Sequence, residues 1–361
     1  MNYLKKYIKF IIILILLVSV YSLRDKIALY FDVVNIIDSE TNSLTLIAPV
    51  LETNIDPDKN LVYCSTAQMA WNCLHNNIIK ETIEIENQPW YVEKLNQHVN
   101  LPPQISQDAY VANAGFGNNI IEKIKEELIK KFKIIPQAIS FPKINDNDIF
   151  AFSYLNKTLD FKEKYGTFYS TMIFNNKSIK VRAFGFENLT NPESTELIKQ
   201  IKILYANNGF IIELITTSEN DNIIISTIKP ADNLLNTYQK INALINDPEN
   251  SFKKKNGSVS IKTLKIPKIN FEIKKQYKEL CGKNFKNSKF KEFNVVEALQ
   301  YIKFKLNERG ARIESYFYEA LTGDGSCELI INGPFTLFIK DKNSTYPYFM
   351  AYIGNDDLLE K

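Results

Sequence analysis

Hydrophobic and polar positions repeat with helical spacing in three segments of the chain. Residues Thr66 to Leu74 are mostly apolar or small, which predicts a short buried helix. The stretch from Glu122 to Lys131 interleaves acidic and basic residues and predicts a surface helix. Leu234 to Ile245 has the pattern of an amphipathic helix. The inner face of the surface helix is predicted to consist of Ile121, Ile124, Leu128 and Phe132.

A different pattern dominates the later part of the chain, where β-branched and aromatic residues form short runs bounded by Asn, Gly and Pro. Such runs predict strands. The last two, Phe335 to Lys340 and Tyr348 to Ile353, are joined by a polar turn. Asn270 to Leu280 is predicted as a strand that passes into a short helix. Helices early and strands late indicate the α+β class. The other predicted strands are Ile149 to Tyr154, Ile179 to Phe186, Gln200 to Tyr205, Phe210 to Thr216, Asn222 to Ile228 and Ser258 to Ile266.

The first 23 residues differ from the rest of the chain. Three lysines precede the apolar run Phe10 to Val18, which is typical of a secretory signal peptide or an N-terminal membrane anchor. Lysines on the N-terminal side favour that end staying in the cytoplasm, so we expect the domain to be secreted or displayed on the surface. The predicted organisation is a leader at 1–23, a linker or helix at 24–41, one domain at 42–354 and a polar tail at 355–361.

Composition narrows the function classes. With 45% apolar and 12% aromatic residues among 361, the chain can bury a large core. A formal net charge of +3 gives no basis for a nucleic-acid partner. The four cysteines form no Cys-x-x-Cys pair and only His75 and His98 are present, so we expect no metal site, no cofactor and no catalytic residues. We expect free thiols or at most one disulfide, and the chain is not predicted to be an enzyme.

Four motifs then occur in an order that resembles the serpin family. Asp56 to Ser65 is similar to the family's entry into its second helix, and Ile266 to Phe271 to a strand that reads Leu-Pro-Lys-Phe-x-Ile in members. Gly333 to Ile339, with Tyr348 to Met350, resembles the C-terminal strand pair. Leu306 to Gly310 resembles the hinge before the reactive loop. The resemblance covers nearly all of the chain beyond the leader, from about Asn42 to about Gly354.

The resemblance implies an α+β fold with three β-sheets and about eight helices early in the chain. It implies a monomer with a target protease as partner and an exposed reactive loop whose scissile bond lies near Asp324-Gly325, in the polar tip of the segment Lys303 to Gly325. The hinge carried over from the family consists of Glu308, Arg309, Gly310 and Ala311. The positions where the largest sheet must open for loop insertion are Cys64, Ala67, Ala151 and Gln300.

This chain departs from the family at several of these positions. Members keep small residues after the hinge glycine, whereas residues 312–317 read Arg-Ile-Glu-Ser-Tyr-Phe, although they alternate as a half-buried strand does. Of the sheet-opening positions, only Gln300 keeps the hydrogen-bonding capacity that closes the sheet in members. The family's tryptophan at the point of loop entry is matched by Leu159. The segment 138–147 is too short for the helix that crosses the front of the sheet, which is therefore predicted to be missing.

Two functions remain open from the sequence. The first is a secreted or surface-anchored inhibitor of serine or cysteine proteases, and the second is a non-inhibitory protein in which the loop binds a partner or is only a strand. Gly310 is equally compatible with a simple turn and Asp324-Gly325 with a hairpin tip. The departures favour the second function and the family resemblance favours the first. From the sequence alone we expect cleavage near Asp324-Gly325 without insertion of the loop.

Overall fold

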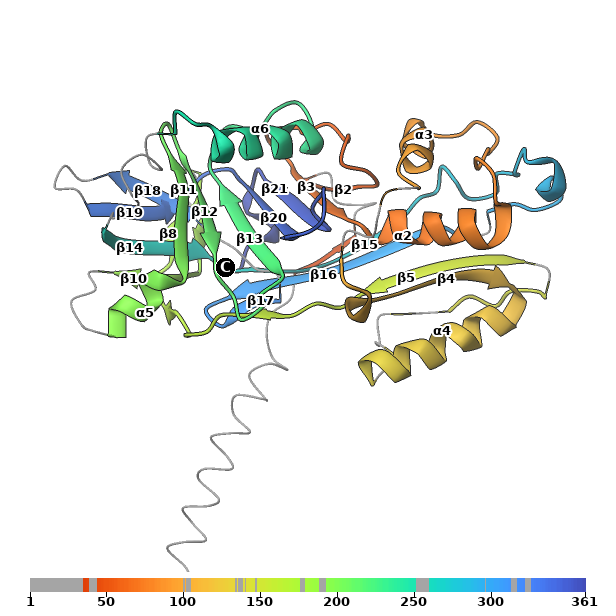
Figure 1. Ribbon diagram of the computed structural model, residues 1–361, viewed down its shortest axis with the longest axis horizontal. Helices are drawn as coiled ribbons and strands as arrows, with labels where there is room; N and C mark the ends of the chain where they lie inside the picture. The colour runs from red at the N-terminus through yellow and green to blue at the C-terminus, as the bar shows by residue number, and fades with distance from the viewer. Residues whose placement is uncertain are drawn as a thin grey trace, which may run out of the picture. The chain divides into compact units, whose positions relative to one another are not determined.

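The structure is a computed structural model that divides into two units, of which the second is Asn35–Lys361 (Figure 1). The predicted leader 1–23 and the predicted scissile bond Asp324-Gly325 lie outside the described residues. The described residues all belong to the second unit: 35–38, 44–99, 101, 105–133, 135, 139, 141–146, 148–175, 179–187, 193–250, 260–295, 297–312, 317–321 and 326–361.

The three helices predicted from periodicity are confirmed. The first is α2 (Thr66–Cys73), the surface helix is α4 (Gly117–Phe132), and the amphipathic helix is α6 (Leu234–Asn246). On α4 the residues Ile121, Ile124 and Leu128 are buried, as their spacing predicts. The other helical segments are α3 (Trp90–Gln97), α5 (Glu193–Lys199), the π-turn η1 (Leu74–Ile79) and the 3-10 turns η2 (Gln107–Ala109), η3 (Ser288–Phe290) and η4 (Asp356–Leu358). The described residues between Phe132 and Ile149 form no helix.

Two sequence predictions of local structure are wrong. After β15 ends at Gln276 the chain turns instead of forming a helix, with Leu280 N–H donating to the carbonyl of Tyr277 (2.9 Å). The predicted strand Ile179 to Phe186 is interrupted at Arg182. There the backbone leaves its neighbours to pair elsewhere, because Arg182 N–H donates to the carbonyl of Glu360 (2.9 Å) and its own carbonyl accepts from Lys268 N–H (3.0 Å).

Three principal sheets organise the domain, which confirms the predicted three-sheet α+β class. The core sheet has seven strands, and we call the two five-stranded sheets the hinge sheet and the loop sheet after the segments they carry. In order across the core sheet, the strands are β11 (Ile201–Ala206), β12 (Phe210–Leu214), β13 (Asp221–Ser226), β20 (Phe335–Asp341), β21 (Phe349–Ile353), β3 (Asn60–Cys64) and β2 (Thr45–Ala48).

The other two sheets hold the segments singled out by the serpin resemblance. The hinge sheet has the order β1 (Asn35–Asp38), β15 (Ile269–Gln276), β16 (Leu299–Asn307), β17 (Gly310–Arg312) and β6 (Leu159–Asp160). The loop sheet has the order β18 (Phe317–Leu321), β19 (Ser326–Ile331), β14 (Ser260–Pro267), β10 (Ala183–Glu187) and β7 (Gly166–Thr167). Two hairpins complete the described strands, β4 (Tyr110–Phe116) with β5 (Ile149–Leu155) and β8 (Met172–Ile173) with β9 (Lys180–Val181).

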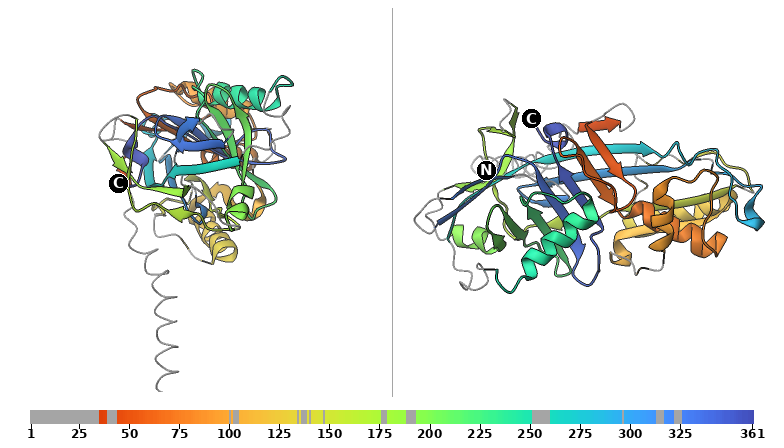
Figure 2. Two further views of the ribbon diagram at one scale, coloured as in Figure 1. Left: turned by 90° about the vertical axis from the view of Figure 1, so that its left-hand side faces the viewer. Right: turned by 90° about the horizontal axis from the view of Figure 1, so that it is seen from above.

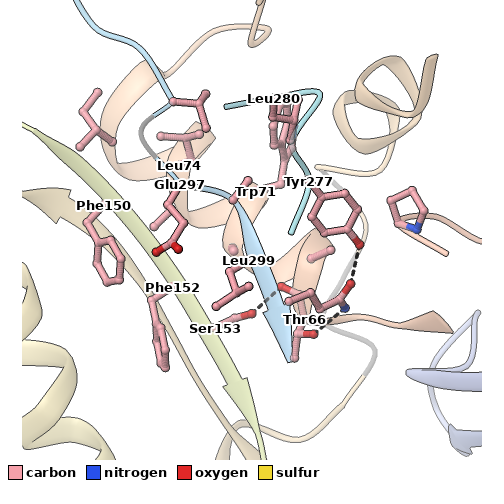
Figure 3. A pocket seen from close by; sticks show the side chains of 18 of the residues that line it. Thr66, Trp71, Leu74, Phe150, Phe152, Ser153, Tyr277, Leu280, Glu297 and Leu299 are labelled. Atoms are coloured by element: carbon pink, nitrogen blue, oxygen red, sulfur yellow. Dashed lines mark hydrogen bonds between the residues drawn. The ribbon is translucent and has the colours of Figure 1, made fainter. Parts of the chain in front are cut away.

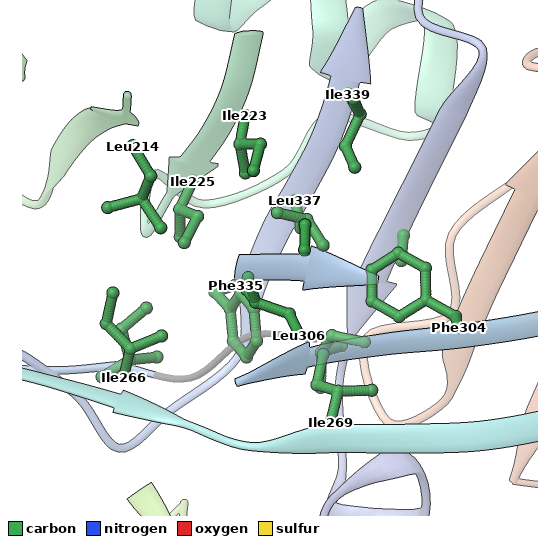
Figure 4. Packing of buried hydrophobic residues seen from close by; sticks show 14 of the residues in the cluster. Leu214, Ile223, Ile225, Ile266, Ile269, Phe304, Leu306, Phe335, Leu337 and Ile339 are labelled. Carbon is green, nitrogen blue, oxygen red and sulfur yellow. The ribbon is translucent and has the colours of Figure 1, made fainter. Parts of the chain in front are cut away.

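The C-terminal strand pair lies at the centre of the core sheet. Phe335 pairs with Ile353 and Ile339 with Phe349, so the predicted adjacency of these buried strands is confirmed. Figure 4 shows side chains of β13 and β20 meeting those of β15 and β16 in the main core. There the rings of Phe304 and Phe349 stack with centroids 4.1 Å apart. The core sheet and the hinge sheet are therefore fastened to each other by apolar packing, while α6 covers the opposite face of the core sheet (Figure 1).

The last residues of the chain take part in the same core. Leu358 and Leu359 are fully buried, and Leu359 forms a bridge with Ile269 at the start of β15. Asn355 donates to the carbonyl of Asp58 (2.9 Å) and is itself buried. The segment after Gly354 is polar in composition, yet it is held against the beginning of β15, next to the hinge.

Candidate functional site

Gly310 and Ala311 of the predicted hinge lie inside the hinge sheet. Gly310 and Ala311 of β17 pair with Asn307 and Leu306 of β16 on one side and with β6 on the other. Gly310 has φ +146, and a Cβ added there would lie 2.4 Å from the carbonyl oxygen of Leu159. Only glycine fits this position, both for its backbone conformation and for the close approach of β6. The first residues after the turn are therefore already a central strand.

The turn before Gly310 is held by charge and by backbone hydrogen bonds. Glu308 forms an ion pair with Lys268 (2.7 Å), and its carbonyl accepts from Tyr165 N–H (2.8 Å). The carbonyl of Arg309 accepts from Phe161 N–H (2.9 Å). Burial raises the pKa of Glu308, but the hydrogen bond and positive charge of Lys268 outweigh burial and hold that pKa below its usual range. The ionised Glu308 thus fixes the turn to the start of β15.

Beyond the hinge the sheet is open. Among the described residues, 299–304 of β16 have no strand neighbour on the side away from β15, and β5 pairs only with β4. A cavity of about 230 Å³ lies between these two strands, with α2 beside it (Figure 3). We call this space between β5 and β16 the gap. The gap lies in line with β17. The edges of β5 and β16 face each other across it, where the sheet lacks a strand.

Three of the four predicted sheet-opening positions line the cavity, and the fourth, Cys64 on β3, contacts Gln300 through its carbonyl. Ala67 on α2 and Ala151 on β5 line the cavity, as does Gln300 on β16. Gln300 Nε2 donates to the carbonyl of Cys64 (3.1 Å), and the Cys64 thiol is buried, which raises its pKa. No bond links Ala67 or Ala151 across the gap, because neither side chain has a polar atom. The two alanines leave space where the family resemblance implied polar closure.

Three further residues at the gap were missed by the sequence reasoning. Thr66 Oγ1 accepts from Gln300 Nε2 (2.9 Å), and Tyr277 O–H donates to Gln300 Oε1 (2.6 Å) (Figure 3). Burial raises the pKa of Tyr277, so its hydroxyl stays protonated and able to donate. Ser153 Oγ donates to the carbonyl of Thr66. These residues come from β5, α2 and the end of β15, and no local motif connects them.

The next described strand after β17 belongs to the loop sheet. Among the described residues, Phe317–Leu321 forms β18, which runs antiparallel to β19 with Leu321 opposite Cys327. The predicted point of loop entry, Leu159, is buried on β6 and pairs with Ala311. The backbone at 317–321 thus occupies an edge of the loop sheet, on the far side of the hinge from the gap.

Three other features bear on function. In the part of the chain that the structure describes, no group of three or more His, Cys, Asp and Glu side chains could hold a metal ion. Cys64, Cys73 and Cys281 are free thiols. A search of the described helices finds none both long and apolar enough to cross a bilayer.

Comparisons with known proteins give matches among solved structures. No protein-family model and no curated protein matches the chain. The serpin of Schistosoma mansoni shares 11% identity, over 82% of this chain and 95% of that one, with a TM-score of 0.45. Maspin shares 12% identity, over 82% and 92%, with a TM-score of 0.47. Manduca sexta serpin-12 shares 10% identity, over 84% and 94%, with a TM-score of 0.47. The domain's three principal sheets and its adjacent C-terminal strands are features that the sequence resemblance to serpins implies.

Proposed function

We propose that this protein is a serpin-type protease inhibitor in which cleavage of the loop lets the segment after Ala311 enter the gap. The observation that carries the proposal is the alignment of the gap with β17, which already lies between β16 and β6. A strand that continued from β17 would find a strand edge on each side. Its backbone N–H and C=O groups would then pair with both β5 and β16.

The register of β17 fixes which residues would meet. Ala311 lies opposite Leu306 and Leu159, so an unbroken register would place Phe317 between Gln300 of β16 and Ser153 of β5. Both of those residues line the cavity. Phe317 would therefore arrive at the cavity, where volume is available for an aromatic ring.

Side-chain alternation supports insertion into this register. Ala311 is buried, and because successive strand residues face opposite sides, Ile313, Ser315 and Phe317 would face the core. Glu314 and Tyr316 would face solvent, so no charge would be buried. Full burial of Ile313 and Phe317 would contribute about 1.5–3 kcal/mol each.

Two departures from the family pattern compensate each other in this geometry. The loop carries a bulky Phe317 where members carry small residues, and the gap carries Ala67 and Ala151 where members carry polar ones. Taken separately, each departure disfavours insertion of the loop. In the register given above, the large side chain of Phe317 and the small side chains of Ala67 and Ala151 are complementary in size.

The location of the protein is part of the same proposal. The lysines and the apolar run before residue 23 support a domain that is secreted or held on the outer surface by its leader. A protease partner would then be an extracellular one.

A second function, a non-inhibitory binding protein, is favoured by β18. Its backbone pairs with β19 from Phe317 to Leu321, and these bonds must break before the same residues can enter the gap. If β18 is too stable to leave β19, the loop remains an edge strand after cleavage.

Incubation with a panel of serine and cysteine proteases separates the two functions. The inhibitor is expected to give an SDS-stable covalent band with at least one protease that cuts within 322–325. Phe317→Glu is expected to abolish the band and leave a protein that is only cut, because a carboxylate would enter the apolar cavity. Tyr316→Glu, whose side chain would face solvent, is the matched control and should keep the band. Cleavage without a band in the unmodified protein, for every protease, would support the binding protein.

A further inference from the structure

The gap has the size and walls of a small-ligand site before any loop enters it. Its volume of about 230 Å³ exceeds the roughly 150 Å³ of an engineered cavity that binds benzene, and lies below the range of drug-sized pockets. Trp71, Leu74 and Leu280 form an apolar wall, and Phe150 and Leu299 lie on the strands that flank it (Figure 3). The space fits one or two fused aromatic rings.

The polar groups of the wall around Gln300 already bond to one another. Gln300 is shared between Tyr277, Thr66 and the carbonyl of Cys64, and Ser153 bonds the carbonyl of Thr66. A guest would have to break these bonds to obtain hydrogen bonds of its own. The cavity therefore favours a guest made mostly of hydrocarbon.

The charged residue Glu297 further limits the class of guest molecule. Glu297 lines the cavity on its solvent-exposed side, next to Leu299, which is 39% exposed. A carboxylate at this entrance repels an anionic guest and leaves a neutral one unaffected. Fatty acids and other anionic amphiphiles are thereby disfavoured.

We propose that the gap is a binding site for a neutral aromatic molecule of one or two rings, and that an occupied gap excludes Phe317. The second clause rests on the proposed inhibitory function, and the first does not. Because the ligand and Phe317 would use the same volume between Ser153 and Gln300, ligand binding would hold the protein in its uninserted state.

Binding is tested on the purified full-length, uncleaved protein with naphthalene as probe, by calorimetry and by the shift in Tm. Naphthalene is expected to bind and to raise the Tm by a few degrees. Ala151→Phe fills the cavity and is expected to weaken binding by about tenfold or more. Ala243→Phe, exposed on α6, which contributes no residue to the cavity, is the control and should leave the affinity unchanged. The anion 2-naphthoate is expected to bind at least about tenfold more weakly than naphthalene, because of Glu297.

Misfolding of Ala151→Phe would be recognised by circular dichroism, and Leu299→Ala then replaces it as the informative variant. Truncating this partly exposed side chain widens the entrance, so the larger neutral probe anthracene is expected to bind it more tightly than it binds the unmodified protein. Equal affinity of naphthalene for the unmodified and filled proteins, or no anthracene gain with Leu299→Ala, would overturn the site.

The regulatory clause has its own readout. After cleavage within 322–325, saturating naphthalene is expected to slow the rise in Tm that accompanies insertion. If naphthalene binds but cleavage produces no rise in Tm, either with or without the ligand, the inhibitory function is contradicted and the site still stands. A rise in Tm in a protein that does not bind naphthalene would contradict the site and leave the function standing.

Discussion

The two halves of β16 have different surroundings. At Leu306 and Asn307 the strand pairs with β17 and packs into the main core, and Leu306 is fully buried. At Leu299 the same strand borders the gap, and its side chain is 39% exposed. The closed half has backbone ladders on both sides, to β15 and to β17, whereas the open half has the ladder to β15 alone, together with side-chain hydrogen bonds around Gln300. A sheet built in this way is rigid at the hinge and adaptable beyond it.

Replacement of Gly310 should produce the largest loss of stability. Gly310→Val places a Cβ 2.4 Å from the carbonyl oxygen of Leu159 and strains a backbone at φ +146, so we expect a loss of about 3–5 kcal/mol in the free energy of unfolding. Gly333→Ala is the control, because nothing lies within 4 Å of its added Cβ. Chemical denaturation of both variants checks the prediction, and similar losses for the two would contradict the tight approach of β6.

The comparison between the halves of β16 is tested directly by two leucines on that strand. Leu306→Ala should cost about 2–5 kcal/mol, since it empties a fully buried site in the main core. Leu299→Ala should cost less than about 1 kcal/mol, because its side chain is partly exposed and borders a cavity already present. Denaturant midpoints with unchanged m-values measure both effects. Equal costs would show that the two halves are packed alike.

Gln300 should matter more than its neighbours at the gap. Gln300→Leu leaves the Tyr277 hydroxyl, Thr66 Oγ1 and the Cys64 carbonyl without their partner, at a cost of about 2–3 kcal/mol. Ser153→Ala removes a single bond and should cost about 1 kcal/mol. Thermal unfolding of the two variants gives the comparison. If Gln300→Leu left the stability unchanged, apolar contacts alone would hold the open half.

Breaking the ion pair at the hinge should cost less than replacing Gln300, and the cost should depend on pH. The folded pKa of Glu308 is lowered, so its stabilisation is present at neutral pH and is lost as pH falls through that lowered pKa, below the ordinary carboxylate value. Glu308→Gln should cost about 1–2 kcal/mol at neutral pH and flatten the acid limb of the stability profile.

Glu360, which also lies near Lys268, is the opposite case. Burial raises its folded pKa, so protonation favours the folded state and stability is lost as pH rises through that pKa. Glu360→Gln should therefore be slightly stabilising at neutral pH. Parallel pH dependence in the two variants would contradict the assigned directions.

Local patterns were sufficient for much of the fold. The spacing of Ile121, Ile124 and Leu128 predicts the buried face of α4, and the two terminal apolar runs predict β20 and β21. The order of motifs places the hinge at Gly310. Each of these inferences depends on residues close together in the chain, where periodicity and turn chemistry act.

The gap could not be predicted in this way. It depends on β5 and β16 failing to pair, although they are far apart in the sequence, and on Thr66, Ser153 and Tyr277 meeting around Gln300. The break at Arg182 likewise depends on the C-terminal segment. Long-range pairing decides such features, and no short motif encodes it.

The most direct test of the open half is the Tm before and after a single cleavage within 322–325. Insertion would add a central strand and bury Ile313 and Phe317, so we expect the Tm to rise by tens of degrees, with Phe317→Glu showing no rise and Tyr316→Glu behaving as the unmodified protein. An unchanged midpoint in the cleaved, unmodified protein would contradict the account, because the gap would then accept no strand.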